Sequence, residues 1–178
     1  MQLQNDQIQK RLTSLIEATQ KLIGMIEPEE LLQHLLESAL RLFTADACSL
    51  ALIDETEQQL AFAMTLGGAR MEEFRLPLGQ GIVGWVAEKG EGVIVNDVSQ
   101  DPRFLGQVDR KTGFRTKAVL CAPLRDEGRV IGAIEVLNTA APGGFAQEDL
   151  ELLLAFGGLA TPALQRTRTF STVRNGKT

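Results

Sequence analysis

The chain of 178 residues, 44% of them hydrophobic, is long enough for one domain with an additional helix and too short for two ordinary domains. Its net charge of −5 disfavours a general nucleic-acid-binding protein, and one histidine with two cysteines lacks the spacing of a metal site or a histidine-based catalytic triad. No apolar run approaches the roughly 20 residues of a membrane span and the first residues lack a signal-peptide pattern, so we expect a cytoplasmic protein without a membrane partner.

Residues 1–27 have the pattern of a polar helix with one narrow apolar seam. The seam residues recur at alternating spacings of four and three: Ile8, Leu12, Leu15, Thr19, Leu22 and Ile26. This spacing is typical of a coiled coil and predicts a helical interface in a homodimer. A helix that packs on its own domain is the alternative.

A second helix begins at Pro28, because proline suits the first position of a helix. Its broad apolar face must pack on a core and consists of Leu31, Leu32, Leu35, Leu36, Ala39, Leu40 and Phe43. Five strand patterns follow, in residues 46–53, 60–66, 92–95, 117–124 and 129–138. Polar turns join the first two strands and the last two strands into hairpins.

Residues 78–90 predict a tight turn followed by a short helix. Gly79 and Gly81 permit the unusual φ angles of a tight turn, and Gly90 suits the C-terminal cap of the helix. The first backbone amides of this helix have no acidic residue beside them and could bind an anion. A turn packed beneath the sheet without a ligand is the alternative.

Residues 96–114 show no periodic pattern, although compact domains rarely contain about twenty residues of irregular chain. We expect this segment to become ordered as a lid over a ligand. Glu135 is a lone carboxylate on an apolar face of the last strand, and a buried charge needs a partner. An arginine of the loop and a bound ligand are equally suitable partners.

The last predicted element is a helix over residues 147–169. Its apolar side consists of leucines, and Pro162 is expected to kink it. Residues 171–178 are polar, and we expect them to form a disordered tail. The two cysteines, Cys48 and Cys121, lie in apolar strand patterns and are expected to be buried free thiols.

Six segments of the chain together resemble the motifs of one protein family. They are GQGIVGWVA at 79–87, NDVSQDPRF at 96–104, DRKTGFRT at 109–116, LCAPL at 120–124, VIGAIEVLN at 130–138 and FAQED at 145–149. In this order and spacing they resemble a GAF domain, and the resemblance covers about residues 28–164.

The resemblance implies an α+β fold with a central antiparallel sheet of about six strands. Terminal helices would pack on one face of the sheet, and a ligand pocket beneath a long lid loop would lie on the other. The GAF domain would occupy residues 28–170, between the helix of residues 1–27 and the tail of residues 171–178. The resemblance also implies a sensory module without enzymatic activity, which binds a small molecule and acts on an effector domain or partner protein.

The motifs are most similar to those of the GAF domains that bind cyclic nucleotides, cAMP or cGMP. In that subgroup the phosphate meets the backbone amides that correspond to Ile82 and Val83. The remaining positions carried over from the subgroup are two lid threonines, a carboxylate of the last strand and a lid position over the base: Thr112, Thr116, Glu135 and Leu105.

The chain departs from this subgroup at four positions. Leu105 lacks the aromatic ring of the lid position, and Thr139 replaces a motif lysine that follows Asn138. Leu150 replaces a motif acid, and Gly67 or Gly68 stands where the nucleotide-binding domains carry a base-reading aspartate. A cyclic nucleotide is therefore one hypothesis among several. A pocket for an apolar ligand or a small anion, lined by Cys48, Leu105, Phe114 and Cys121, is a second.

Two further functions are compatible with the same residues. In one, the protein is a dimerisation module whose pocket is filled by its own side chains, with Leu105 and Phe114 as plugs. In the other, Cys48 or Cys121 is a nucleophile or redox thiol of an enzyme, although thiols in the middle of a strand are usually inert.

Overall fold

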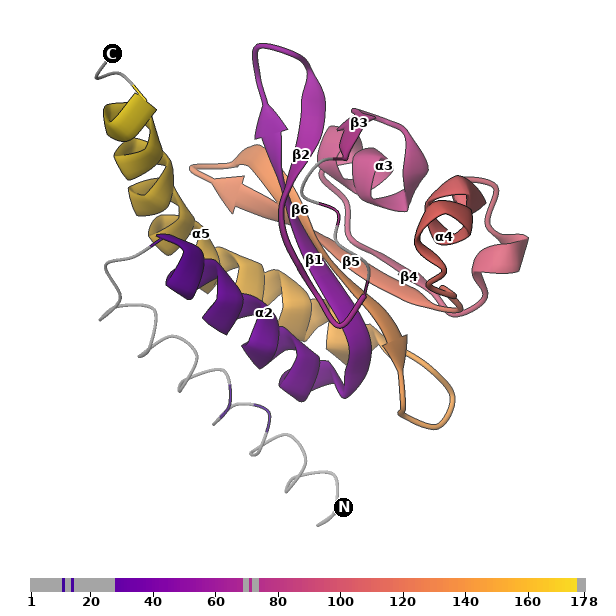
Figure 1. Cartoon of the computed structure of the whole chain (residues 1–178). Helices are drawn as coiled ribbons and strands as arrows, with labels where there is room; N and C mark the ends of the chain where they lie inside the picture. Colours follow the sequence, from indigo (N-terminus) through magenta and orange to yellow (C-terminus); the bar gives the residue numbers. More distant parts are fainter. Residues whose placement is uncertain (1–10, 12–13, 15–27, 69–70, 72–73, 176–178) are drawn as a thin grey trace.

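The computed structural model describes residues 11, 14, 28–68, 71 and 74–175. Apart from Arg11 and Ser14, the predicted seam helix lies outside the described residues, so the coiled coil and the homodimer stay predictions. The described elements, shown in Figure 1, are α2 (Pro28–Phe43), β1 (Ala45–Asp54), β2 (Gln59–Leu66), β3 (Arg75–Pro77), α3 (Gly81–Lys89), β4 (Val93–Val95), η1 (Val98–Gln100), α4 (Gly106–Thr112), β5 (Val119–Asp126), β6 (Arg129–Thr139) and α5 (Gln147–Asn175).

One sheet of six strands forms the centre of the molecule, with the order β3-β2-β1-β6-β5-β4 and every neighbouring pair antiparallel. Both predicted hairpins, β1–β2 and β5–β6, are confirmed, and the pairing of β1 with β6 joins them. The sixth strand, β3, was not among the five predicted from the pattern, because three residues that end in proline carry no alternation to detect.

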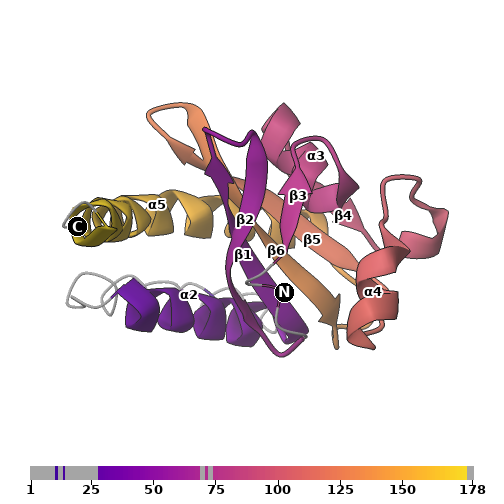
Figure 2. The same cartoon turned by 45° about the horizontal axis from the view of Figure 1, so that its top comes forward.

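The helices α2 and α5 lie side by side on one face of the sheet, and α3 and α4 lie on the other (Figure 2). The predicted α+β architecture is therefore confirmed. Each face has its own hydrophobic cluster. Leu35, Leu36 and Phe156 belong to the cluster beneath α2 and α5, whereas Ile82, Val83 and Val86 of α3 belong to the cluster on the opposite face.

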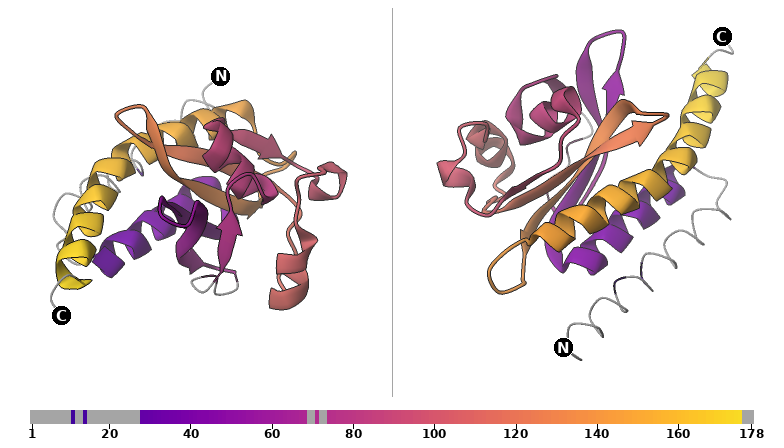
Figure 3. Two further views of the ribbon diagram at one scale, coloured as in Figure 1. Left: turned by 90° about the horizontal axis from the view of Figure 1, so that it is seen from above. Right: turned by 180° about the vertical axis from the view of Figure 1, so that it is seen from behind.

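The helix α5 extends to Asn175, and Figure 3 shows it bending along its length. The prediction of a disordered tail from residue 171 is therefore wrong for residues 171–175. The physical reason is that adding residues to an existing helix costs little, and the sequence has no glycine or proline after Pro162 until Gly176. Among the described helices, none is long and apolar enough to cross a membrane.

Candidate functional site

The turn before α3 has the geometry that its glycines predict. Gly79 and Gly81 have φ angles of 81° and 70°, and the amide of Gly79 donates to the carbonyl of Gly84 at 3.0 Å. Gly90 ends the helix in the left-handed conformation, as expected. Ile82 and Val83 lie in the first turn, where backbone N–H groups have no partner within the helix. The predicted apolar face of this helix is confirmed, because its residues are buried against the sheet.

Residues 96–116, called here the lid segment, are not irregular throughout, and that expectation is corrected. The carboxylate of Asp97 accepts from the Ser99 amide and starts η1. The short helix α4 follows and ends at Gly113, which has a φ of 73°. None of the residues of α4, all of them described, is buried. A helix without an apolar face leaves no periodicity in the sequence, which is why it was missed.

Two asparagines fix the ends of the lid segment, one to the connection between β6 and α5 and the other to the end of β6. The side chain of Asn96 exchanges two hydrogen bonds with the backbone of Phe145, at 2.8 and 2.9 Å. The side-chain oxygen of Asn138 accepts from the amides of Lys117 and Ala118, at 2.8 and 3.1 Å, and its nitrogen donates to the carbonyl of Arg115 at 3.0 Å. We call the contacts of the Asn138 side chain the Asn138 clamp.

The departures from the nucleotide-binding motif have visible structural consequences. Thr139, in place of the motif lysine, donates its hydroxyl to the carbonyl of Phe43 at 2.9 Å. Asp149 therefore takes another cation, and its Oδ1 lies 2.5 Å from Nη1 of Arg11. The other carboxylate oxygen of Asp149 accepts from the amide of Ala146 at the start of α5. Asp149 thus joins Arg11 to Ala146, at the end of the β6–α5 connection.

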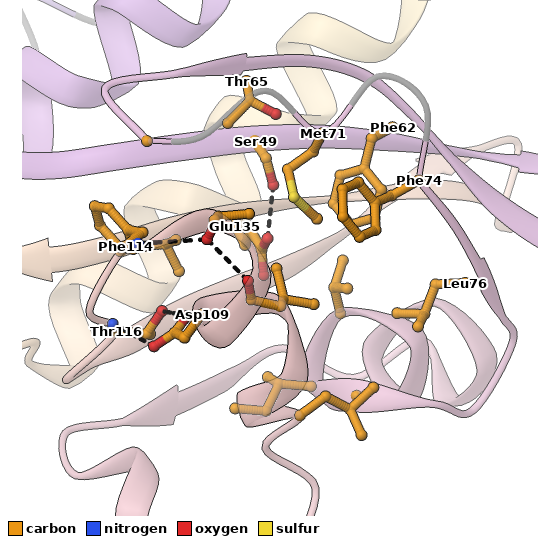
Figure 4. Close-up of a pocket in the computed structure, with 18 of the residues that line it drawn as sticks. Ser49, Phe62, Thr65, Met71, Phe74, Leu76, Asp109, Phe114, Thr116 and Glu135 are labelled. Atoms are coloured by element: carbon orange, nitrogen blue, oxygen red, sulfur yellow. Dashed lines mark hydrogen bonds between the residues drawn. The ribbon is translucent and has the colours of Figure 1, made fainter.

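A cavity of about 110 Å³ lies between the sheet, α3 and the lid segment (Figure 4). Seven of the nine predicted site residues line it: Ile82, Val83, Leu105, Thr112, Phe114, Thr116 and Glu135. Sequence reasoning missed the residues contributed by β1, β2, β3 and the chain before it, and by the cavity side of α4 and the residue before its N-cap. They include Ser49, Phe62, Thr65, Met71, Phe74, Leu76, Phe104, Val108 and Asp109.

Glu135 points into this cavity from β6 and accepts a hydrogen bond from the hydroxyl of Ser49 at 2.6 Å. Burial raises the pKa of the Glu135 carboxyl above 4.5; the Ser49 bond opposes this shift, and the nearby Asp109 carboxylate adds to it. An arginine of the loop, one of the two partners considered for Glu135, does not pair with it among the described residues. Arg103 instead pairs with Asp101 at 2.6 Å and lies 4.5 Å from the centre of the Trp85 ring.

The raised pKa of Glu135 predicts a pH dependence of stability. The folded state favours the protonated carboxyl, so the stabilisation is fully present below pH 4.5 and is lost as the pH rises through the raised pKa. Glu135→Gln should therefore gain stability relative to the parent protein as the pH rises from 4 to 8. Urea unfolding across this range measures the difference. The exposed Glu91→Gln serves as the control, and an equal slope for both variants would contradict the prediction.

Both lid threonines are engaged within the lid segment. The hydroxyl of Thr116 donates to Asp109 at 2.8 Å and its amide donates to the same carboxylate at 2.7 Å. The hydroxyl of Thr112 donates to the carbonyl of Val108 at 2.8 Å. Asp109 therefore ties α4 to the strand-like chain that follows it. A lone aspartate in a segment without periodicity gave no signal for this role.

The predicted place of the cysteines in the cavity is corrected, although both are buried free thiols as expected. Cys48 faces the α2–α5 side, where its thiol donates to the carbonyl of Leu36 at 3.2 Å. Burial, with a smaller contribution from Glu135, raises the pKa of Cys48 to about 12. Cys121 packs in the cluster on the α3 side without lining the cavity, and burial also raises its pKa. Neither thiol has the environment of a nucleophile.

The sequence of this chain matches the model of one protein family and the sequences of several curated proteins. The family model of the GAF domain matches residues 26–165. The dual 3′,5′-cyclic-AMP and -GMP phosphodiesterase 11A of Takifugu rubripes is 35% identical over 131 residues, which cover 65% of this chain and 14% of that protein. The probable 3′,5′-cyclic phosphodiesterase pde-5 of Caenorhabditis elegans is 31% identical over 150 residues, 78% of this chain and 20% of that protein. The chain thus spans a fifth or less of the length of these relatives.

Solved structures share the fold at lower identity. A GAF domain from a phosphoenolpyruvate-protein phosphotransferase of Coxiella burnetii matches with a TM-score of 0.81 and 20% identity, over 91% of this chain and 96% of that one. The free methionine-R-sulfoxide reductase of Neisseria meningitidis, solved with its substrate, matches with a TM-score of 0.75 and 18% identity, over 90% of this chain and 91% of that one. At these identities the likeness concerns the fold alone.

Proposed function

Because the chain belongs to the GAF domain family, we propose that it is a regulatory module that binds a small molecule in the cavity beneath the lid segment. The observation that carries this proposal is the cavity itself, with apolar walls and a few polar groups that converge on it from β1, β6 and α4. We propose a binding role and no enzymatic one, since the thiols are buried and the resemblance implies a sensor. A cytoplasmic location stays a prediction.

The proposed signal passes from the lid segment to the terminal helices. Ligand contact with α4 would change the position of the lid segment. Asn96 connects the first end of that segment to Phe145, just before α5, and Asn138 connects its second end to the end of β6. The lid segment would have one position with the ligand bound and another without it. A ligand shifts the equilibrium between these two positions only by the difference in its affinity for them. The helices would act on a second copy or on an effector domain. The exposed Leu154 on α5 supports a contact surface there.

The family relatives suggest a cyclic nucleotide, cAMP or cGMP, as the first ligand to test. The first-turn amides of Ile82 and Val83 support this hypothesis, because a helix N-terminus attracts a phosphate. In its present shape the cavity, at about 110 Å³, is too small for a nucleotide. An engineered protein cavity of about 150 Å³ holds a benzene molecule, so a nucleotide would need α4 to move outward from its present position.

Isothermal titration with cAMP and with cGMP tests this hypothesis. We expect saturable binding, and we expect Thr116→Ala to weaken it by about tenfold, because the variant loses the hydroxyl bond to Asp109 and keeps only the amide bond, which holds α4 less firmly. Thr56→Ala, in the exposed β1–β2 turn, should leave the affinity unchanged. Binding that is equally strong in both variants would contradict the assignment of the nucleotide to this cavity.

One observation favours the second candidate function, a dimerisation module with a self-filled cavity. Leu105 lies over the helix start, with its Cδ1 3.2 Å from the position that a Cβ would take on Gly81. Phe114 similarly lies against Gly68. If Leu105→Ala opens the site, the variant should bind a small molecule that the parent protein does not. A thermal-shift screen with metabolites that is flat for the parent protein and positive for Leu105→Ala, together with a dimer in native mass spectrometry, would favour this function.

A further inference from the structure

One row of polar side chains crosses the floor of the cavity. Ser49 of β1 pairs with Thr65 of β2 on one side and with Glu135 of β6 on the other. Residues paired across neighbouring strands share a face of the sheet, so all three side chains line the cavity. The Thr65 hydroxyl is buried, and among the described residues it has no hydrogen-bond partner. Buried hydroxyls without a partner are costly, so this row has capacity for a polar group of a ligand.

The charges that face the cavity are mainly negative. The two described carboxyl groups in its lining are Glu135 and Asp109, from opposite walls. The described guanidinium in the lining is that of Arg75, whose exposed side chain donates to the carbonyl of Phe74. Burial and the Asp109 carboxylate both disfavour the ionised form of Glu135, and a positive charge placed between the two carboxyl groups would favour that form.

The side walls are aromatic and suit a cation with an apolar body. Phe62, Phe74 and Phe114 surround the polar row, and Met71 lies beside them (Figure 4). Aromatic rings attract cations through the negative charge of their faces. One of these rings already has such a contact, since the ammonium of Lys111 lies 5.7 Å from the centre of the Phe74 ring.

The opposite end of the cavity offers little room for an anion at the start of α3. Leu105 and Leu76 lie 3.2 and 3.4 Å from the position that a Cβ would take on Gly81, so two aliphatic side chains are in contact with the helix start. A charged group there would have to displace these leucines before it reached the first-turn amides of α3. The polar row and the helix start therefore differ in the charge that they accept.

We propose that the cavity selects a small organic cation, a primary ammonium or amidinium group on an apolar body no larger than one aromatic ring. At about 110 Å³ the cavity takes such a ring with a small outward shift of α4, less than a nucleotide would need. The cation lies on the row of Thr65, Ser49 and Glu135, and the apolar body lies between the phenylalanine rings. This inference rests on the proposed function of small-molecule binding and names the chemistry of the ligand. It differs from the nucleotide hypothesis, in which the ligand carries a negative charge.

Three probes with the same ring and different charge test the inference: benzylammonium, benzyl alcohol and benzoate. Isothermal titration of the full chain should give an affinity for benzylammonium about tenfold or more above that for benzyl alcohol, and the weakest binding for benzoate. Glu135→Gln keeps the shape of the side chain and should remove most of this preference. Thr65→Val should weaken the binding of benzylammonium several-fold, and the exposed Glu91→Gln should leave its affinity unchanged.

The proton balance provides an independent readout. An ammonium beside Glu135 favours its ionised form, so binding of benzylammonium should lower the pKa of this carboxyl. Titrations in two buffers across a range of pH should therefore show proton release where Glu135 titrates, in the parent protein and not in Glu135→Gln. Equal affinity for the three probes, or a benzylammonium affinity unchanged in Glu135→Gln, would overturn the inference. Binding of cAMP or cGMP without benzylammonium binding would overturn it and leave the proposed function standing. Binding of none of these compounds would count against both.

Discussion

Asn138→Ala is expected to lower the free energy of unfolding by about 3 kcal/mol and to loosen the end of the lid segment. The substitution removes the Asn138 clamp, so the amides of Lys117 and Ala118 and the carbonyl of Arg115 each lose their side-chain partner. A lost hydrogen bond costs roughly 1 kcal/mol, and a buried group left without a partner costs more. Asn138 is only 8% exposed, so water cannot replace the amide easily.

The backbone of Asn138 provides the control. Its φ is 53°, a left-handed conformation that asparagine tolerates better than alanine and glycine tolerates best. Asn138→Gly therefore removes the clamp without backbone strain, and it should be about 1 kcal/mol more stable than Asn138→Ala. Urea unfolding gives both values. Hydrogen exchange should accelerate at Lys117 and Ala118 in both variants, and unchanged protection of these amides would contradict the role of the clamp.

Phe156→Ala is expected to lower the free energy of unfolding by about 4 kcal/mol, the range for deletion of a buried aromatic side chain. Phe156 lies on α5, is 2% exposed and belongs to the cluster between the sheet and the α2–α5 layer. The large effect follows because the cavity left behind is surrounded by the sheet and cannot close. The result would show that α5 is an integral part of the domain.

Leu154, two residues earlier on the same helix, is the matched control. It is 40% exposed, so Leu154→Ala should change the free energy of unfolding by no more than about 0.5 kcal/mol. Urea unfolding of the two variants at the same pH measures the contrast. Equal effects would mean that the described packing of α5 on the sheet is wrong.

The parts of the fold that the sequence predicts are those with a repeated pattern or a glycine of fixed role. The apolar runs of β1, β2, β5 and β6 with the polar turns between them predict both hairpins, and the apolar spacing of α3 between its glycines predicts that helix with its cap. The same reasoning failed for α4 and β3. The first has no buried face and the second is three residues long, so neither leaves a periodic signal.

The site was predictable where it depends on the family motifs and unpredictable where it depends on strand register. Glu135 and Thr116 were identified, whereas Ser49 and Thr65 were not, because only the pairing of β1 with β2 and β6 places them beside Glu135. Cys48 was misplaced for a related reason. It precedes Ser49, and adjacent residues of a strand point to opposite faces, so the thiol lies against Leu36 and outside the cavity.

The most direct test of the central claim, that the cavity beneath the lid segment binds a ligand, is a methyl NMR titration of protein labelled at methionine. Met71 lines the cavity, whereas Met64 packs against the cluster on the α2–α5 side. With benzylammonium, cAMP and cGMP as titrants, we expect at least one to shift the Met71 methyl signal saturably, with a much smaller effect on Met64. A Met71 signal that no titrant moves, or a shift confined to Met64, would contradict the account.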